Sequence, residues 1–246
     1  MDAKLIRGGM TSSNKHPDAP WRNFYGRIHG KTMNQAQKDY LVEDLDALSP
    51  GAVSWDINPT RQPLDMAARF KGKPVWLEIG FGGGEHLVHM GETYPEVEII
   101  GCEPFMNGVA MLLGKIRAMQ TQNVAVHPGD VRDVFDVLPD HSISKAFLNY
   151  PDPWPKKRHH RRRFVTQDHL APLFRVLKPG SEFRVATDIP DYVRQTLEEV
   201  PKAGFVSTAK GPEDWRTPWS DWTSTRYEQK ALREGRTPHY LTFIRP

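Results

Sequence analysis

The sequence predicts an α/β fold with a mostly parallel central sheet that helices cover on both faces. From Pro74 onward, short apolar runs alternate with segments of helical periodicity. This pattern is typical of parallel strands that are buried on both faces. Glycines and acidic residues stand directly after several of these runs, where open α/β sheets bind their ligands. The strand ends are therefore where a site is expected.

The individual elements follow from local patterns. A helical period over 34–48 places Tyr40, Leu41, Leu45 and Leu48 on one face. Apolar runs predict strands at 75–79, 97–102, 124–127, 143–150 and 182–187, and 240–244 is a candidate final edge strand. Helices are expected at 85–94, 106–120, a short stretch ending at 138, 167–177 (stopped by Lys178-Pro179-Gly180) and 191–200.

The length of 246 residues suits one large α/β domain or two small ones. We expect a basic N-terminal arm and helix over 1–48 and the main domain over 49–246. Residues 1–32 are rich in Gly, Pro, Asn and Lys, which predicts a flexible arm. The chain has no repeat of 20–50 residues.

Composition excludes several classes of protein. No stretch approaches the ~18 apolar residues of a membrane span, and the start lacks the apolar region of a secretory signal. Cys102 is the only cysteine, which excludes intrachain disulfides and Cys-based zinc sites. We therefore predict a cytoplasmic protein without a membrane anchor or a metal site.

Positive charge is unevenly distributed. The formal net charge is only +3, but residues 1–40 hold seven Lys/Arg against three Asp, and 156–163 hold six Lys/Arg and no acid. Concentrated positive charge in a near-neutral chain is typical of a nucleic-acid binder. A solvated surface run is the alternative for 156–163. Prolines before this run predict a stiff, extended backbone over 149–163.

The ends of the first three predicted strands carry a glycine-rich turn and two acids. Glycines at 80–84 would let the backbone approach a ligand, although a packing turn is the alternative. Glu103 is placed to accept hydrogen bonds from both ribose hydroxyls of an adenosine cofactor, or to serve the dipole of the next helix. Asp130 is placed to contact the edge of an adenine ring, or to act as the N-cap of the next helix.

The fourth and fifth strands end in Asp152, within Pro151-Asp152-Pro153-Trp154, and in Asp188, which could also cap the next helix. A glycine turn plus an acid fits either a nicotinamide cofactor or S-adenosylmethionine. The Pro-Asp-Pro-Trp segment resembles the (Asp/Asn)-Pro-Pro-aromatic loop of methyltransferases that act on nitrogen atoms. S-adenosylmethionine is therefore the favoured cofactor.

Several segments together resemble the tRNA (guanine-N7)-methyltransferases. They match in the family's order across about residues 22–246, and the Pro-Asp-Pro-Trp and Thr-x-Tyr-Glu blocks are the specific ones. The matching segments are 77–84, 101–104, 129–130, 149–159, 177–180, 186–188 and 225–228, with Gly26, Arg27 and Lys31 in the basic arm. Tyr150 departs from the family, where a Phe often precedes Pro-Asp-Pro-Trp.

The resemblance implies a Rossmann-like class I methyltransferase fold and a role for individual residues. Glu78, Gly80, Glu103 and Asp130 would bind S-adenosylmethionine, and Asp152 would lie between the cofactor and the base as the catalytic aspartate. The implied tRNA contacts are Lys156, Asp188, Thr225, Arg226, Tyr227 and Glu228. The implied product is 7-methylguanosine in the tRNA variable loop, position 46 in tRNA numbering.

Three alternatives stay open. The chain could methylate another RNA base or a small molecule, or it could be a non-catalytic RNA-binding module.

Thr225 and Glu228 also form a capping-box pattern ahead of a helix that runs to about Glu234 and stops at Gly235. Three tryptophans before it are expected to pack rather than stack on bases: Trp215, Trp219 and Trp222. No obligate protein partner is indicated, and the enzyme would be a monomer or a homodimer.

Overall fold

A computed structural model describes residues 16–20, 22–28 and 30–246. The strands are β1 (Val75–Ile79), β2 (Glu98–Cys102), β3 (Val124–His127), β4 (Ile143–Asn149), β5 (Leu177–Thr187), β6 (Val206–Ser207) and β7 (His239–Ile244). The helices are α2 (Gln35–Glu43), α3 (Met66–Phe70), α4 (Glu85–Thr93), α5 (Met106–Met119), α6 (Val131–Phe135), α7 (Gln167–Val176), α8 (Pro190–Lys202) and α9 (Arg226–Arg233). Two 3₁₀ helices are η2 (Lys157–Arg162) and η3 (Pro212–Trp215).

The strands are hydrogen-bonded in the order β3-β2-β1-β4-β5-β7-β6. The pairs β2–β3, β1–β4 and β4–β5 are parallel, whereas β7 is antiparallel to β5 and β6. The prediction of a mostly parallel sheet is thus confirmed. The chain divides into two compact units: unit 1 comprises the residues up to Pro74 and Gly80–Pro139, and unit 2 comprises Val75–Ile79 and Asp140–Pro246.

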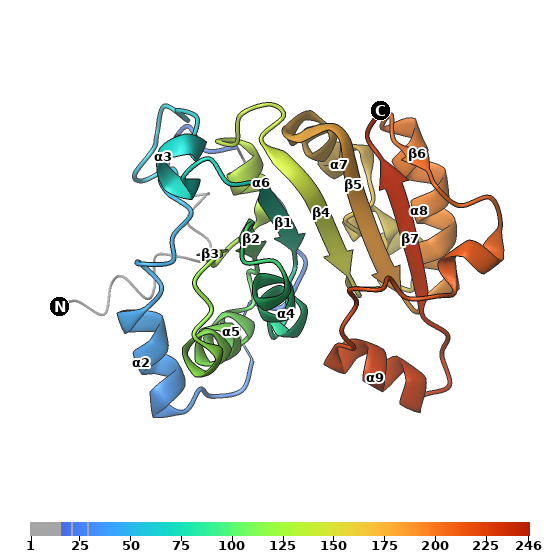
Figure 1. Ribbon diagram of the computed structural model, residues 1–246, viewed down its shortest axis with the longest axis horizontal. Coiled ribbons are helices and arrows are strands. Elements are labelled where there is room, and N and C mark those ends of the chain that lie inside the picture. Colours follow the sequence, from blue (N-terminus) through green and yellow to red (C-terminus); the bar gives the residue numbers. More distant parts are fainter. Residues whose placement is uncertain (1–15, 21, 29) are drawn as a thin grey trace. The chain divides into compact units, whose positions relative to one another are not determined.

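Unit 1 is built on the parallel pair β2–β3. Helix α4 packs against both strands and against α5, and α2 packs against α5 (Figure 1). The apolar runs that predicted these strands supply the core, since Ile99 and Ile100 are fully buried. Leu112 and Leu113 of α5 are also fully buried. Burial of such side chains contributes about 1.5–3 kcal/mol each.

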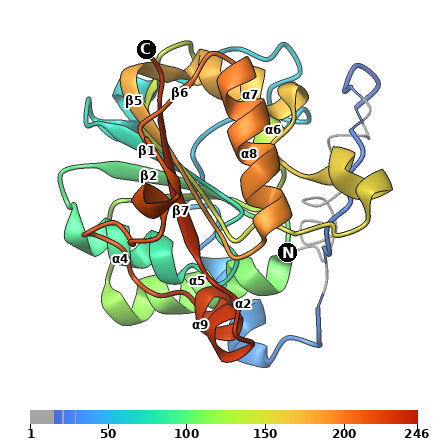
Figure 2. The ribbon, with the colours of Figure 1, turned by 90° about the vertical axis from the view of Figure 1, so that its right-hand side faces the viewer.

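Unit 2 is built on β1, β4, β5 and β7. Helices α7 and α8 contact each other and β5, and Figure 2 shows them side by side. Phe147, Phe183 and Phe243 come from three of its strands and are fully buried, and the rings of the last two lie 6.4 Å apart between centroids. In Figure 1, α9 lies beyond the arrowheads of β4 and β5. It therefore stands at the carboxyl ends of these strands.

The boundary between α7 and β5 differs from the prediction. Helix α7 ends at Val176, and Leu177 already has an extended backbone (φ −70°, ψ 144°) and pairs with Ile143. The predicted stop signal, residues 178–180, therefore lies inside β5. Gly180 has φ +80°, and the pairing with β4 shifts register between Ile143 and Lys145. A proline and a left-handed glycine are tolerated there because the strand is irregular at this point.

Other strands and helices also differ from the sequence prediction. Strand β7 is not an edge strand, because the short strand β6 pairs with its other side. The sequence did not predict β6, because a strand of two residues is too short to show an alternating pattern. Helix α2 is shorter than the predicted 34–48. Asn34 caps it through a capping box, and it ends at Glu43. Helix α3 was not predicted.

The described part of the predicted flexible arm is held in place within unit 1. The Arg22 guanidinium pairs with Asp133 at 2.9 Å and with Asp136 at 2.7 Å. The backbone N–H of Gly30 donates to Asn107 Oδ1 at 2.8 Å. Charge pairing and a hydrogen bond from the backbone thus hold residues 22 and 30 against unit 1, although the described residues of 22–31 form no helix or strand. The prediction for residues 1–15, 21 and 29 lies outside the described residues. Among residues 16–20, 22–28 and 30–246, no helix is long and apolar enough to cross a membrane.

Candidate active site

In unit 1, the glycine-rich turn is bonded to the acid at the end of β2. The Glu103 carboxylate accepts hydrogen bonds from the backbone N–H of Gly82 at 2.7 Å and of Phe105 at 2.9 Å. Glu103 therefore supports the start of α5, as one of its two expected roles requires, and also holds the glycine turn, while its contact with ribose hydroxyls stays a prediction.

Helix α5 holds the same turn from the other side. A Cβ on Gly108 would lie 2.2 Å from the carbonyl oxygen of Gly82, so only glycine permits this approach. The Lys115 ammonium donates to the carbonyl of Gly83 at 2.8 Å and pairs with Glu85 at 3.3 Å. The sequence contained no signal for either contact, because both depend on how α5 packs.

Gly80 and Gly84 show that the turn has an open side and a packed side. Both have positive φ, +71° and +79°. A Cβ on Gly84 would meet Leu112 Cδ1 at 2.5 Å, whereas a Cβ on Gly80 would meet no atom within 4 Å. The predicted packing role fits Gly84, and the predicted ligand approach fits Gly80. The open space beside Gly80 and the Glu103 carboxylate together suit an adenosine group.

Asp130 is the N-cap of α6. Its carboxylate accepts from the Arg132 backbone N–H at 2.9 Å and pairs with the Arg132 guanidinium at 2.5 Å. The capping alternative is thus what the structure shows, and the adenine contact stays a prediction. Burial, and secondly the charge of Asp130, raises the pKa of nearby Asp133 to about 6. Burial lowers the pKa of His127 to about 4.

In unit 2, two buried polar side chains mark the strand ends. Glu78 lies in β1 opposite Phe147 of β4 and is 2% exposed. Asn149 is the last residue of β4, and its side-chain oxygen and nitrogen are both buried without a hydrogen-bond partner in the protein. A buried unpaired amide costs about 1–3 kcal/mol. Such a cost at a strand end indicates a place where a ligand would bond, and sequence reasoning had not assigned Asn149 a role.

The segment after β4 is turned rather than uniformly extended. Tyr150 and Trp154 have positive φ values of 49° and 41°, and residues 157–162 form η2. The predicted extended backbone over 149–163 is therefore wrong. Prolines constrain their own φ, but Tyr150 before Pro151 and Trp154 between Pro153 and Pro155 adopt left-handed conformations that interrupt the extended backbone. Asp152 is exposed on this loop, and exposed Lys156 precedes η2.

Helix α9 begins with the predicted cap but uses Glu228 differently. The Thr225 hydroxyl accepts from the Glu228 backbone N–H at 3.3 Å. The buried Glu228 carboxylate accepts bonds from the Trp222 indole at 3.0 Å, from the Tyr150 hydroxyl at 3.2 Å and from the Tyr240 hydroxyl. Burial, and secondly the Glu228 charge, raises the pKa of Tyr150. Glu228 thus joins the Asp152 loop to α9.

The other predicted RNA contacts occupy different environments in unit 2. The Arg226 guanidinium lies 5.2 Å from the ring centroid of Tyr227, which is 43% exposed. Asp188 is nearly buried and pairs with Arg236 at 2.5 Å. It does not cap α8, because the N-cap is Ile189.

Two of the three tryptophans before α9, Trp219 and Trp222, pack within the protein, as expected. Trp219 and Trp222 meet edge to face with centroids 5.6 Å apart, and the Trp219 indole donates to Thr242 Oγ1 at 2.8 Å. Within unit 2 the fold therefore joins residues from β4, α9 and β7. Within unit 1 it joins the glycine turn and Glu103.

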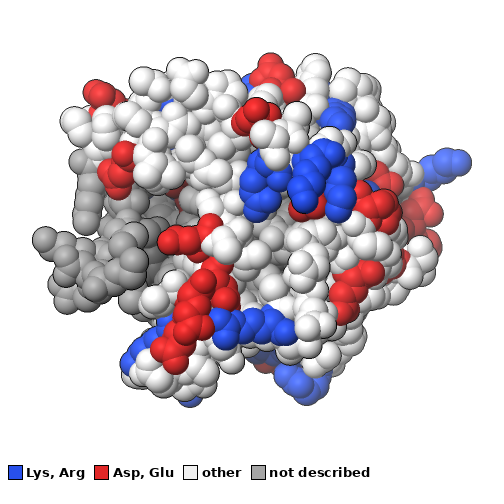
Figure 3. Space-filling view, turned by 60° about the vertical axis from the view of Figure 1, so that its left-hand side comes forward, with Lys and Arg blue, Asp and Glu red and all other residues white. Residues whose placement is uncertain are grey.

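The basic run does not form one exposed patch. Lys156, Lys157, Arg158 and Arg161 are exposed, but Arg163 is 1% exposed. The expectation that the run faces RNA as a whole is therefore wrong for Arg163. Figure 3 shows Lys and Arg side chains gathered in separate groups beside Asp and Glu on the face presented.

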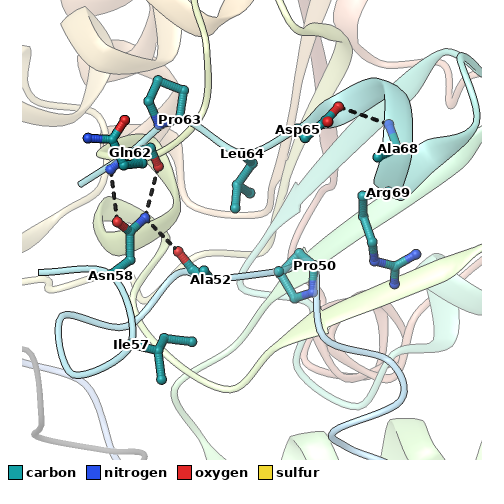
Figure 4. Close-up of a pocket in the computed structure, with 11 residues that line it drawn as sticks. Pro50, Ala52, Ile57, Asn58, Gln62, Pro63, Leu64, Asp65, Ala68 and Arg69 are labelled. Atoms are coloured by element: carbon teal, nitrogen blue, oxygen red, sulfur yellow. Dashed lines mark hydrogen bonds between the residues drawn. The ribbon is translucent and has the colours of Figure 1, made fainter. Parts of the chain in front are cut away.

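A pocket in unit 1 has none of the predicted site residues in its lining. It is lined by side chains of residues 50–69 (Figure 4). The Asn58 amide donates to the carbonyls of Ala52 and Gln62 at 2.9 and 2.8 Å, and its oxygen accepts from the Gln62 N–H. Asp65 caps α3. These polar groups are committed to holding the loop, so the pocket shows no chemistry of its own.

Comparison with known proteins gives consistent matches. Residues 72–241 match a family described as "Putative methyltransferase". A tRNA (guanine-N(7)-)-methyltransferase of Ruegeria sp. (strain TM1040) is 70% identical over 98% of this chain and 95% of its own length. Proteins of the same name from Ruegeria pomeroyi and Jannaschia sp. are 72% and 68% identical over 95% and 94% of this chain, and over 98% of their own lengths.

Among solved structures, the 16S rRNA methyltransferase KamB aligns with a TM-score of 0.51 at 16% identity. The alignment covers 71% of this chain and 89% of that chain. At this identity the likeness supports the fold alone.

Proposed function

The chain belongs to the tRNA (guanine-N(7)-)-methyltransferase family, and on that premise we propose that it methylates a guanosine of the tRNA variable loop, position 46 in tRNA numbering. The reaction class is transfer of a methyl group from S-adenosylmethionine to guanine N7. The observation that carries the proposal is the identity of 68–72% with enzymes of this name over at least 94% of the chain. The methyltransferase domain would span residues 49–246, after the basic arm and helix of 1–48.

Residues at the strand ends would hold the cofactor. Glu103 is bonded to the glycine turn and offers oxygens to ribose hydroxyls, while Gly80 leaves space for the ligand. Asp130 and Glu78 would contact other parts of the cofactor, and Asn149 adds an unpaired amide. When bound, S-adenosylmethionine supplies an electrophilic methyl group.

Asp152 would orient the base rather than act as an obligatory general base. Guanine N7 has a free lone pair on the major-groove edge, so it needs no deprotonation before it is methylated. The remaining task is positioning, which can account for several kcal/mol of a barrier. The exposed Asp152 carboxylate can accept hydrogen bonds from the N–H edge of the base.

The exposed cations after Asp152 would bind phosphates of the tRNA. Lys156 precedes η2, whose Lys157 and Arg158 are also exposed. Thr225 and Glu228 fix the start of α9, from which Arg226 and Tyr227 would reach the RNA, and Asp188 would contact it beside them. The protein would act in the cytoplasm as a monomer or homodimer.

The test is incubation with labelled S-adenosylmethionine and tRNA, followed by nucleoside analysis. We expect 7-methylguanosine, and its absence would refute the proposed function. A transcript with adenosine at position 46 should lose the product; an unchanged yield would refute the position. A product methylated at another base, or binding without product, would favour the alternatives named above.

The role of Asp152 is tested with Asp152→Asn at saturating tRNA and cofactor. We expect kcat to fall by about 10²-fold, the loss that follows when a reacting group is misplaced by about 1 Å. Asp168→Asn, an exposed acid in the first turn of α7, is the matched control and should keep its kcat. Near-normal turnover of Asp152→Asn would contradict the assignment.

A further inference from the structure

Arg163 ends the basic run, yet its side chain is fully buried, with no exposed area. An unpaired cation cannot be buried at acceptable cost, so its partners define its role. The guanidinium pairs with the Asp191 carboxylate at 2.9 Å and donates to Gln195 Oε1 at 2.9 Å. It also lies 5.2 Å from the ring centroid of Tyr192. All three partners come from the first two turns of α8.

The other edge of the same guanidinium faces the Asp152 loop. Nε donates to the carbonyl of Pro153 at 2.9 Å, and Nη2 donates to the carbonyl of Trp154 at 3.4 Å. These are the two residues that follow Asp152. Arg162 contacts the same loop, with its guanidinium 5.0 Å from the Trp154 ring centroid. Arg163 therefore connects the loop backbone to α8.

The loop needs such support because its backbone is strained. Trp154 has φ +41° and Tyr150 has φ +49°, conformations that cost about 1–3 kcal/mol each and persist only where neighbouring structure imposes them. Tyr150 is held through its hydroxyl by Glu228. On the other side of Asp152, the bonds from Arg163 to the carbonyls of Pro153 and Trp154 hold the loop.

We propose that Arg163 is a positioning residue, which fixes the direction of the Asp152 carboxylate by clamping the two carbonyls after it to α8, and that it does not contact RNA. The planar guanidinium has five donors in a fixed fork, so it can serve both the loop and α8 at once. The basic run thus divides by burial into exposed cations and one internal clamp. The inference rests on the proposed function for its kinetic consequences only.

The kinetic test compares Arg163→Gln with Arg161→Gln, which removes the same charge from an exposed position of η2. For Arg163→Gln we expect kcat to fall by about 10–100-fold, as misplacement by about 1 Å does elsewhere, with KM for tRNA and its salt dependence retained. For Arg161→Gln we expect a higher KM and a salt slope shallower by about 1. The opposite pattern would overturn the proposal.

Hydrogen exchange without substrate separates this inference from the proposed function. In Arg163→Gln, the amides of His159 and Arg163, which donate to the carbonyls of Lys156 and His160, should exchange faster while those of β5 remain protected. Unchanged exchange at these two amides would overturn the clamp even if the wild type makes 7-methylguanosine. Absence of 7-methylguanosine with the wild type would refute the function alone. If Arg163→Gln does not fold, Asp191→Asn replaces it. That variant weakens the clamp from α8 and should show the same loss of kcat.

Discussion

Gly108→Ala tests how helix α5 holds the glycine turn. The new Cβ would lie 2.2 Å from the Gly82 carbonyl oxygen and 3.4 Å from Glu103 Cγ. To restore ordinary contact, the turn or the helix must move by roughly 1 Å in a close-packed interior. A shift of this size would stretch the 2.7 Å bond from Gly82 to Glu103 beyond the range of a hydrogen bond.

The expected magnitudes follow from these contacts. Loss of a hydrogen bond to a charged group costs about 1.5–3 kcal/mol, which corresponds to about 10–100-fold in Kd for S-adenosylmethionine. Overpacking lowers the free energy of unfolding by about 1–3 kcal/mol. The gain of about 1 kcal/mol in helix propensity for Gly→Ala offsets part of this.

Calorimetric titration with S-adenosylmethionine and urea unfolding measure the two effects. Gly114→Ala on the same helix is the matched control, because its Cβ would meet only the Tyr40 side chain, at 3.3 Å or more. This control should keep the wild-type Kd. If Gly108→Ala also kept the wild-type Kd and free energy of unfolding, the account of the turn would be refuted.

Three other predictions concern pH, capping and RNA. Asp133 has a raised pKa, so it contributes stability that is fully present below pH 3.8 and is lost as the pH rises through 6. His127 has a lowered pKa, so it contributes stability that is fully present above pH 6.5 and is lost as the pH falls through 4. Asp133→Asn removes the first contribution and leaves that of His127, so the free energy of unfolding should rise between pH 4 and 6.5, by at most about 1.4 kcal/mol per pH unit. A flat profile of urea unfolding over this pH range would contradict the prediction. Thr225→Ala should cost about 1 kcal/mol in urea unfolding, since it removes the N-cap bond to Glu228, and an unchanged midpoint would show that the cap contributes nothing. Arg158→Gln should raise KM for tRNA and leave the Kd of S-adenosylmethionine intact; a weaker cofactor Kd would mean that Arg158 is structural.

Much of the architecture could be predicted because its signals are local. Apolar runs of four to eight residues identified β1 to β4 almost to the residue, since a parallel strand buried on both faces must be apolar along its length. Thr225 three positions before Glu228 predicted the start of α9 correctly. The comparisons confirmed the family that the segments around Asp152 and Thr225 resemble. The roles of individual site residues stay predictions.

Long-range contacts account for what the sequence could not predict. Arg163 is indistinguishable from its neighbours in a basic run, and contacts with distant residues such as Asp191, 28 residues away, make it an internal clamp. The donors to Glu228 include Tyr150, 78 residues distant. The sequence by itself determined the fold class, most of the parallel strands and the family, because periodicity, turn preferences and motifs act within a few residues. Only the tertiary structure decided which charges are buried and what they hold, because burial depends on segments that folding brings together.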